Sequence, residues 1–477
     1  MVTKEIKKEN DKIERDEKMI KDTEFHVPRI KISDLSVGSS MDVRALREDH
    51  SILEDTFKRR KLDDTPVKEF YRLDTEWRNM LQQVNAYKSG KNKLSIEISK
   101  TDSEVSRKTL VENAAKINRD MAEAEKRLEA IAKERQDVLL ALPNIVDPLM
   151  PLEKQETIFK YGTPKVLRTK IADFEEQEGD NYIPVKLVKS QYDILTEYDL
   201  ADEDRGGQLA GQRFYYMKNE LVMLDSALSM YAMRKLYNKG FKPIIPPYLV
   251  KRFVEASATT LGAFEEMIYK IEGEDAYLIP TAEHPIAAYN SDSTLEEKDL
   301  PIRYAGFSAA FRKEAGAHGK DTKGIYRNHQ FNKVEQYIIC KKDQVENELN
   351  GTISNQCELL KDLGLPFRVI LMPAWDMDLK AIFHADVEAW FPGQNKYGEL
   401  GSHANVGTWQ AHRLRIKYQR TGVSEKAYVH TIYGTMVPIE RTLASVLENN
   451  LDEDSIIHVP KVLADISGVD EIKPKKK

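Results

Sequence analysis

Hydrophobic residues recur every three or four positions from Val67 to Leu142, a stretch that contains no proline and one glycine, Gly90. Spacing of this kind is the a/d pattern of two helices that pack along a shared seam. Lys91 and Arg135 interrupt the pattern, once in each half. The seam positions are Phe70, Leu73, Trp77, Met80, Val84, Tyr87, Leu94 and Ile98, then Leu110, Ala114, Ile117, Met121, Ala124, Leu128, Ile131, Val138 and Leu142. The pattern therefore predicts two long helices in succession.

The ends of these helices carry their own signals. Thr65 followed by Pro66 is typical of a helix start, because a hydroxyl can cap the first turn and proline presets φ there. The polar run 99–106 breaks the pattern as a turn would, and Pro143 ends the second helix. We therefore predict an antiparallel helical hairpin whose arms, at about 1.5 Å per residue, are each about 50 Å long.

The outward positions of this hairpin carry many lysines and arginines, with acidic residues interleaved. A hairpin of this length serves either as a spacer or dimerisation arm, or as a lever that reaches a large partner. The charge pattern alone does not choose between the two uses.

The composition of the rest of the chain changes at two further points. Residues 1–40 are dense in alternating charge, which predicts a flexible N-terminal extension before the arm at 41–143. Residues 144–207 contain several prolines and glycines and are predicted to be a linker. From 208 to 477, hydrophobic runs of helix and strand length alternate, which predicts one α+β domain with a short basic tail.

Near the start of that domain, Arg213 to Asn238 is predicted to be a helix that ends at Gly240. An extended run, 241–247, follows it and finishes in a pair of prolines.

Composition excludes several classes of protein. The 477 residues include 72 basic and 78 acidic side chains, and a net charge of −6 excludes a protein that binds nucleic acid by bulk positive charge. Cys340 and Cys357 are too few for a disulfide framework and lack metal-ligand spacing, which indicates a reducing compartment. The chain has neither a run of about 20 apolar residues nor an apolar signal core at its N-terminus. We therefore expect a cytoplasmic protein with no membrane partner.

The segment 311–335 carries the most chemistry. It has a strand-like flank at each end and a loop rich in glycine, lysine and arginine between them. Arg312 and Arg327 can bind phosphate oxygens bidentately, Phe331 offers a stacking face for a base, and Glu314 can accept from an exocyclic amine. These are parts of a nucleotide site without a Walker loop, and a charged surface hairpin is the alternative that these spacings leave open.

This segment resembles motif 2 of the class II aminoacyl-tRNA synthetases, in the form found in seryl-tRNA synthetases. The predicted helix before Gly240 and the run to Pro247 resemble motif 1, the dimer-interface element. The segment 434–450 resembles motif 3. Thr281-Ala-Glu283 resembles the family's amino-acid loop, and 397–402 resembles the segment that holds metal and ATP.

The resemblance extends beyond these catalytic motifs and covers about residues 41 to 465. The hairpin at 67–142 resembles the family's arm, which grips the long variable arm of serine tRNA. The implied fold is α+β: a class II antiparallel sheet flanked by helices, preceded by a long antiparallel coiled-coil hairpin, in a homodimer.

The resemblance also implies a reaction, in which ATP activates serine to seryl-adenylate and the seryl group passes to the 3′ end of serine tRNA. Arg312 and Arg441 would be the catalytic residues, and Glu399 and Ser402 would coordinate Mg²⁺. The implied ATP site comprises Arg312, Lys313, Glu314, Arg327, Phe331, Glu399, Leu400, Gly401, Ser402 and Arg441. The implied serine site comprises Thr281, Ala282, Glu283, Glu335 and Thr435. Its carboxylates and hydroxyls suit a substrate with an ammonium and a hydroxyl, because a buried polar group left unpaired is costly.

Several positions depart from the family's usual pattern. Tyr433 stands where an asparagine is usual, and Glu440 places a carboxylate directly before Arg441. The other departures are Gly401, His403, Ala404, Met436, Val437 and Pro438. They indicate either drift with compensating changes or a slowed, respecialised or inactive paralogue.

Three hypotheses about function follow. The first is a working seryl-tRNA synthetase. The second is a paralogue that activates an amino acid for a carrier protein or another tRNA, and the intact hairpin argues against it. The third is an inactive coiled-coil scaffold, and the retained Arg312, Glu399 and Arg441 argue against that.

Overall fold

The computed structural model describes residues 25, 27–33, 38–260, 267–314 and 323–475. Contacts divide the chain into two compact units, residues 1–30 and 31–477. The described residues of the first unit form neither helix nor strand, and the elements below all belong to the second. Most of the predicted extension 1–40, and Lys476 and Lys477 of the basic tail, lie outside the described residues.

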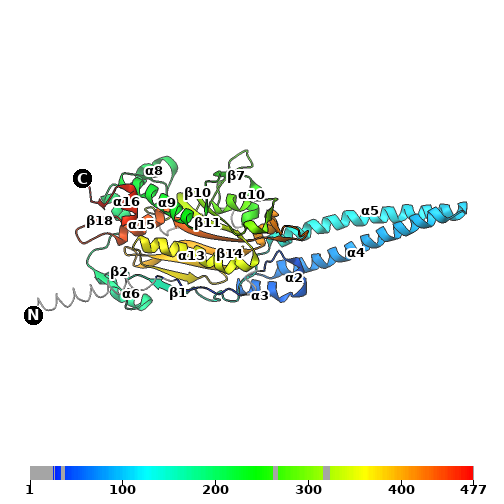
Figure 1. The fold of residues 1–477 in the computed structure, drawn as a ribbon, viewed down its shortest axis with the longest axis horizontal. Helices are drawn as coiled ribbons and strands as arrows, with labels where there is room; N and C mark the ends of the chain where they lie inside the picture. The colour runs from blue at the N-terminus through cyan, green and yellow to red at the C-terminus, as the bar shows by residue number, and fades with distance from the viewer. Residues whose placement is uncertain (1–24, 26, 34–37, 261–266, 315–322, 476–477) are drawn as a thin grey trace, which may run out of the picture. The chain divides into compact units, whose positions relative to one another are not determined.

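The predicted helical hairpin is present. Helix α4 spans Thr65–Lys100, α5 spans Glu104–Ala141, and the two pack against each other as an antiparallel pair (Figure 1). Helix α4 begins at Thr65 with Pro66 in its first turn. Residues 101–103 connect the helices, and α5 ends with Leu142 as its C-cap, directly before Pro143. The prediction of an antiparallel coiled-coil arm is therefore confirmed.

At the base of the hairpin, one buried carboxylate joins three helices. Asp74 on α4 accepts two hydrogen bonds of 2.8 Å from Arg47, which lies on the short helix α2 (Val43–Glu48). It also accepts one of 2.7 Å from Arg135 on α5, the residue that interrupts the hydrophobic pattern there. The apolar residues fully buried along the seam are Val67, Phe70, Leu73, Val84, Ala124, Ile131 and Leu139. Helix α3 (Ser51–Arg59) lies between α2 and α4 in the sequence.

The core of the second unit is a sheet of eight strands in the order β1-β12-β13-β14-β17-β11-β10-β6. All neighbouring pairs are antiparallel except β10 and β6, which are parallel. The strands are β1 (Glu156–Tyr161), β6 (Lys242–Ile244), β10 (Ile302–Phe311), β11 (Gln330–Cys340), β12 (Phe367–Leu371), β13 (Phe383–Phe391), β14 (Lys396–Gly407) and β17 (His430–Pro438). This is the antiparallel class II sheet that the sequence predicts, and the segment treated as a linker, 144–207, supplies its edge strand β1.

Three longer helices pack on this sheet (Figure 1): α9 (Glu220–Asn238), α13 (Val345–Asp362) and α15 (Ile439–Asn449). Helix α13 packs against β11, β13, β14 and β17. Side chains of β11 alternate between the two faces of the sheet, and Gln336 donates a 3.0 Å hydrogen bond to the Thr352 carbonyl of α13. The odd-numbered neighbours of Gln336 therefore face away from α13.

The predicted helix from Arg213 is wrong over its first seven residues, because α9 begins at Glu220. Arg213 and Asn219 both have positive φ angles, of 63° and 53°, which a helix does not allow. Between them Tyr216–Met217 forms strand β5, and the Asn219 side chain donates 2.7 Å to the Asp199 carbonyl. Tertiary contacts thus override the apolar spacing there, whereas Gly240, at φ 85°, follows the end of α9 as predicted.

The remaining helices are α6 (Ile171–Glu178), α7 (Gln191–Glu197), α8 (Glu203–Ala210), α10 (Arg252–Ala258), α12 (Glu283–Ala288), α14 (Trp409–Leu414) and α16 (Lys461–Ser467). The remaining strands are β2 (Lys165–Leu167), β3 (Ile183–Val185), β4 (Ala201–Asp202), β7 (Leu249–Val250), β8 (Tyr277–Leu278), β9 (Thr294–Glu296), β15 (Lys417–Gln419), β16 (Lys426–Tyr428), β18 (Ile457–His458) and β19 (Glu471–Ile472). Within the described ranges, no helix has both the length and the apolar character needed to cross a membrane.

Candidate active site

A cavity lies over the sheet face that points away from α13. Phe331, Lys333 and Glu335, alternate residues of β11, line it. Thr435 of β17 is paired in register with Glu335, and it also lines the cavity. The strand pleat therefore fixes which side chains of the central strands reach the site.

One end of the cavity is formed by the β10–β11 hairpin. Arg312, just after β10, places its guanidinium 5.4 Å from the centre of the Phe331 ring. Arg327 donates a 2.6 Å hydrogen bond from Nε to Oε2 of Glu314, whose backbone φ is 49°. These four predicted residues, separated by up to 19 positions in the sequence, all line one end of the cavity. The loop between them, 315–322, lies outside the described residues.

The opposite wall of this end comes from β14 and α15. Arg441 of α15 lies 3.4 Å from a carboxylate oxygen of Glu399 and donates 3.1 Å to the Glu399 carbonyl. Desolvation in the cavity would raise the pKa of Glu399, but the guanidiniums of Arg441 and Arg312 outweigh it, so the pKa is lowered. Glu399 is therefore ionised at neutral pH and faces the cavity beside two arginines.

The second end of the cavity is lined with carboxylates and hydroxyls. The Thr281 hydroxyl donates 2.7 Å to Glu335, and the backbone N–H of Glu283 donates 3.2 Å to the Thr281 hydroxyl. Lys333 forms an ion pair with Glu335. Thr281, Glu283, Lys333 and Glu335 are all buried. This end therefore offers fixed acceptors and donors to a small polar molecule.

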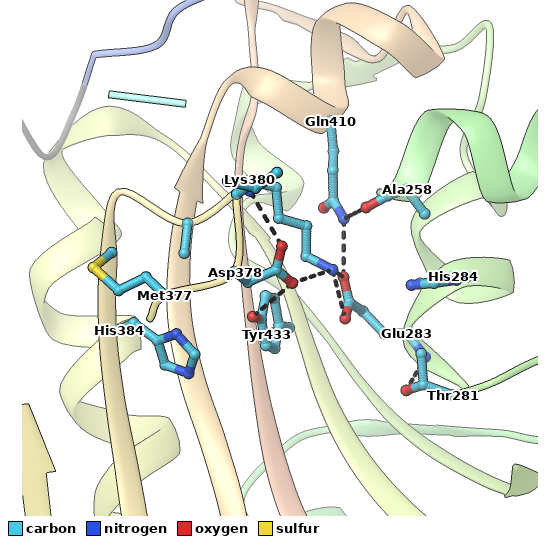
Figure 2. A network of polar contacts seen from close by, with 12 residues as sticks. Ala258, Thr281, Glu283, His284, Met377, Asp378, Lys380, His384, Gln410 and Tyr433 are labelled. Atoms are coloured by element: carbon cyan, nitrogen blue, oxygen red, sulfur yellow. Dashed lines mark hydrogen bonds and ion pairs between the residues drawn. The ribbon is translucent and has the colours of Figure 1, made fainter. Parts of the chain in front are cut away.

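Two residues that sequence reasoning missed complete this end (Figure 2). Asp378 and Lys380 lie in the loop between β12 and β13, and both line the cavity. The Lys380 ammonium lies 2.9 Å from Glu283 and 3.2 Å from Asp378. The Tyr433 hydroxyl, which the sequence marks as a departure, donates 3.4 Å to Asp378. An acidic and a basic residue two apart in a loop have no distinctive spacing, so only the fold reveals them.

Two of the predicted site residues do not line the cavity. The ammonium of Lys313 lies 5.8 Å from the centre of the Tyr269 ring, and its backbone N–H donates to the Met267 carbonyl. Ala282 is fully buried, and its Cβ would lie 3.3 Å from a Cβ added at Gly306. Ala282 lies between Thr281 and Glu283 in the sequence, and its side chain packs into the core near Gly306. All the other predicted ATP-site and serine-site residues line the cavity.

Two of the departures in β14, Gly401 and His403, adjoin α13. His403 is buried and hydrogen-bonds to Thr352 at 3.1 Å and to Gln356 at 2.7 Å, both on α13. Burial lowers its pKa to about 3, so the ring is neutral. A Cβ at Gly401 would lie 2.5 Å from Gln356, so no side chain fits there. His403, Gln356 and Gly401 therefore form one compensating group, which supports drift with compensation at these positions.

The residues predicted to hold Mg²⁺ lie together. Ser402 Oγ and Glu399 Oε1 are 3.5 Å apart. Within the described parts of the chain, no group of three or more histidine, cysteine, aspartate or glutamate side chains could hold a metal ion. Mg²⁺ commonly takes only one or two protein oxygens and completes its shell with substrate phosphates and water. The pair Glu399 and Ser402 fits a magnesium ion that arrives with a nucleotide.

Comparisons with known proteins cover almost the whole chain. The family model for the seryl-tRNA synthetase N-terminal domain matches residues 41–146. The model for the class II tRNA synthetase core domain (G, H, P, S and T) matches 266–450. The serine–tRNA ligase of Pyrococcus horikoshii is 38% identical over 92% of this chain and 98% of its own length. That of Korarchaeum cryptofilum is 36% identical over 91% and 96%, respectively.

Two solved structures are similar over the same extent. The seryl-tRNA synthetase of Pyrococcus horikoshii complexed with ATP has a TM-score of 0.88 at 38% identity, and covers 91% of this chain and 100% of its own. The cytoplasmic serine–tRNA ligase of Naegleria fowleri in complex with AMP has a TM-score of 0.80 at 31% identity, with coverage of 94% and 100%.

Proposed function

The chain belongs to the seryl-tRNA synthetase family, and we propose that the cavity on its sheet is where serine reacts with ATP before passing to tRNA. The protein is an ATP-dependent aminoacyl-tRNA ligase for serine. One observation carries the assignment of the reaction to this cavity. An arginine-rich end and an end of carboxylates and hydroxyls adjoin in one cavity, as ATP and a small polar amino acid require.

The arginine-rich end is proposed to bind ATP. Phe331 is proposed to stack on the adenine, and the guanidinium of Arg312 lies 5.4 Å from the centre of its ring. Arg312 and Arg441 supply charge for the α- and γ-phosphates, and Arg327 faces the phosphates from the far side of the loop. Glu314 is proposed to contact the adenine, and its hydrogen bond from Arg327 fixes its carboxylate.

Glu399 and Ser402 are proposed to hold Mg²⁺ against the phosphates. The bound ion would neutralise phosphate charge during displacement of pyrophosphate. The lowered pKa of Glu399 keeps its oxygens unprotonated and available as ligands.

Serine is proposed to bind among Thr281, Glu283, Glu335 and Thr435. The ammonium and hydroxyl of serine each need partners in a buried site, and these side chains provide acceptors on several sides. Alanine lacks the hydroxyl and would leave one of these groups unpaired, which favours serine.

The reaction follows from this placement. The serine carboxylate oxygen attacks the α-phosphorus, the bond to the bridging oxygen breaks, and pyrophosphate leaves. A hydroxyl of the terminal adenosine of tRNA then attacks the carbonyl carbon of the adenylate, and AMP leaves. Both steps depend on positioning and on charge stabilisation by Arg312 and Arg441, with no protein nucleophile.

The hairpin of α4 and α5 is proposed to bind the long variable arm of serine tRNA, and the protein to act in the cytoplasm as a homodimer through motif 1. The hairpin's outward lysines and arginines can contact phosphates locally, although the whole chain is slightly acidic.

ATP–pyrophosphate exchange across the amino acids, followed by tRNA charging, tests this function. We expect exchange with serine and charging of serine tRNA. Lack of exchange with serine would contradict the function and favour an inactive scaffold. Exchange without charging would instead favour a paralogue with another acceptor.

The proposed use of the hairpin has its own test. A variant in which residues 67–142 are replaced by a short flexible linker should keep exchange and lose charging, because the adenylate site is built without these residues. The full-length protein is the control in both assays. Charging at the full-length rate would contradict the proposed role of the arm.

A further inference from the structure

The amino-acid end of the cavity is closed by a hydrogen-bond network. Tyr337 and Thr431, the next inward-facing residues of β11 and β17, donate to the side-chain oxygen of Gln410 at 2.9 and 3.0 Å. The Gln410 amide donates 2.9 Å to Oε1 of Glu283 and 3.0 Å to the Ala258 carbonyl. The Glu283 carboxylate is therefore held by a hydrogen-bonded side chain that is itself fixed by three partners.

Lys380 holds Glu283 from the opposite side (Figure 2). Its ammonium lies 2.9 Å from Oε1 and 3.2 Å from Oε2 of Glu283, and 3.2 Å from Oδ2 of Asp378. An ammonium has three N–H donors, so these acceptors use all of them. Lys380 has no donor left for a substrate, and any effect it has on serine acts through Glu283.

The contacts of Glu283 leave one direction open. Its Oε1 accepts a hydrogen bond from Gln410 and lies 2.9 Å from the Lys380 ammonium, and its Oε2 accepts a hydrogen bond from Lys380. A carboxylate has about four acceptor directions, so one direction remains, on Oε2. The positions of Gln410 and Lys380 therefore determine at which oxygen Glu283 can accept a hydrogen bond from the amino acid.

The net charge of Glu283, Asp378 and Lys380 also complements the single ammonium of serine. Glu283, Asp378 and Lys380 together carry one net negative charge. Burial opposes ionisation of both Asp378 and Lys380, but their mutual attraction outweighs it, so the pKa of Asp378 is lowered and that of Lys380 is raised. The Lys380 ammonium also lies 4.7 Å from the centre of the Tyr433 ring, which favours a cation there.

The loop that carries Asp378 and Lys380 is itself fixed. Arg60, buried at the end of α3, donates 2.7 Å to the Ala381 carbonyl and 3.4 Å to the Asp378 carbonyl. Asn144 donates from its backbone to the Leu379 carbonyl at 2.7 Å and from its side chain to the Lys380 carbonyl at 2.9 Å. The backbone of Lys380 is thus held on both sides before any ligand binds.

From these contacts we propose that Lys380 is a positioning residue that sets the affinity for serine, because its ammonium fixes Glu283 with one oxygen direction open to the amino acid. The inference deepens the proposed function and rests on it, since serine is the molecule that meets Glu283. Asp378 and Tyr433 hold Lys380 in place.

Two variants test the inference, measured by serine-dependent ATP–pyrophosphate exchange. Lys380→Met keeps the length of the side chain and removes the ammonium, and we expect the KM for serine to rise about tenfold. The KM for ATP and kcat should each stay within about twofold, because Lys380 contacts neither nucleotide nor reacting atoms. Lys341→Met is the matched control, since Lys341 also lies beside two carboxylates, at 3.3 and 3.7 Å, but outside the cavity.

The double variant Asp378→Asn/Lys380→Met separates positioning from charge balance. It restores the net charge of the cluster without an ammonium, and it leaves Glu283 as the one carboxylate of the cluster that has lost its cation. We expect the KM for serine to stay about tenfold raised. Return to the wild-type KM would show that Lys380 only neutralises Asp378 and would overturn the inference.

Thermal unfolding of both variants checks that the fold is kept. If Lys380→Met alone is unstable, the KM for serine is taken from the double variant. An unchanged KM in both variants would contradict only this inference, since serine activation would persist. A wild-type protein that neither binds nor activates serine would contradict the proposed function and the inference with it.

Discussion

At the residue scale, the carboxyl group beside Arg441, the proposed catalytic arginine, has an unusual environment. Glu440 directly precedes Arg441 and is buried, where it accepts hydrogen bonds of 3.0 and 2.8 Å from the backbone N–H of Asn332. Burial, together with the nearby Asp225, raises the pKa of Glu440 to about 8. The group therefore carries a proton at neutral pH, and the added carboxylate does not oppose phosphate binding at Arg441.

This environment predicts a pH dependence of stability. Because the folded protein holds the Glu440 proton more tightly than the unfolded chain, its contribution is complete below the ordinary pKa of 4.5 and is lost as pH rises toward about 8. The slope is at most about 1.4 kcal/mol per pH unit. Glu440→Gln should flatten this slope, measured by denaturant unfolding between these two values. Glu425→Gln, at an exposed position, is the control, and an equal slope in both variants would contradict the assignment.

At this scale, sequence reasoning singled out residues that belong to a motif. Arg312 and Phe331 lie in a segment whose composition already indicates a nucleotide, and the structure places both in the cavity. Lys380 could not be found in this way, because its partner Glu283 is 97 positions away in the sequence. Contacts of that range depend on how β12 and β13 pair, which local spacing does not encode.

At the scale of elements, the base of the hairpin depends on Asp74. This carboxylate is the shared acceptor of Arg47 on α2 and Arg135 on α5, and Arg78, one turn away on α4, lies 3.2 Å from it. Removing this buried carboxylate leaves three arginines without their shared partner, and Arg135, the least exposed of them, loses the most.

Asp74→Ala should therefore loosen the hairpin where it leaves the catalytic domain. We expect tRNA charging to fall more than tenfold, as the arm loses its fixed direction, while serine-dependent exchange changes less than about twofold. The matched control is Glu76→Ala, because Glu76 pairs with Arg72 and Arg127 at the surface, where such pairs contribute about 0 to 1 kcal/mol. Equal losses of charging and exchange in Asp74→Ala would contradict the separation of arm and active site.

Elements with a regular period were predictable, and those set by tertiary contacts were not. The seam from Phe70 onward repeats over many turns, so the hairpin follows from the sequence. The start of α9 did not follow, because Asn219 and its neighbours are held by contacts with residues near 199. Apolar residues do recur before Glu220, but the segment there forms the two-residue strand β5 instead of a helix.

At the scale of the whole molecule, the segment resembling motif 1 exposes several large apolar side chains. Ile245 is 67% exposed, and Val222, Met223, Met230 and Tyr237 are also exposed. Apolar residues of this size, gathered in one segment of a folded chain, are typical of a surface that another protein covers. This supports the homodimer proposed above.

Ile245→Glu should weaken that dimer by at least about tenfold, because a buried carboxylate without a partner is costly at an interface. Sedimentation velocity at several protein concentrations measures the shift toward monomer. Val105→Glu is the control, since Val105 is 79% exposed near the turn of the hairpin, and this variant should sediment like the wild type. A dimer unchanged by Ile245→Glu would place the interface elsewhere.

Composition predicts the order of the extension, the hairpin and the α+β domain along the chain, but it does not predict how the segments between them fold. The residues treated as a linker, 144–207, supply an edge strand, which no local feature of the segment indicates. Edge strands are short and mixed in polarity, so their sequences resemble those of loops.

The positions of Arg60 and Asn144 determine where the hairpin can be exchanged for that of another protein. Both residues flank the hairpin, yet both bind the loop that carries Lys380. A chimera that takes a foreign arm as far as residues 60 and 144 would also replace the supports of the loop that carries Lys380, in the pocket proposed to bind serine. Crossover points inside Thr65–Ala141 keep those supports, so under the proposed roles a new tRNA preference could be grafted there without altering the choice of amino acid.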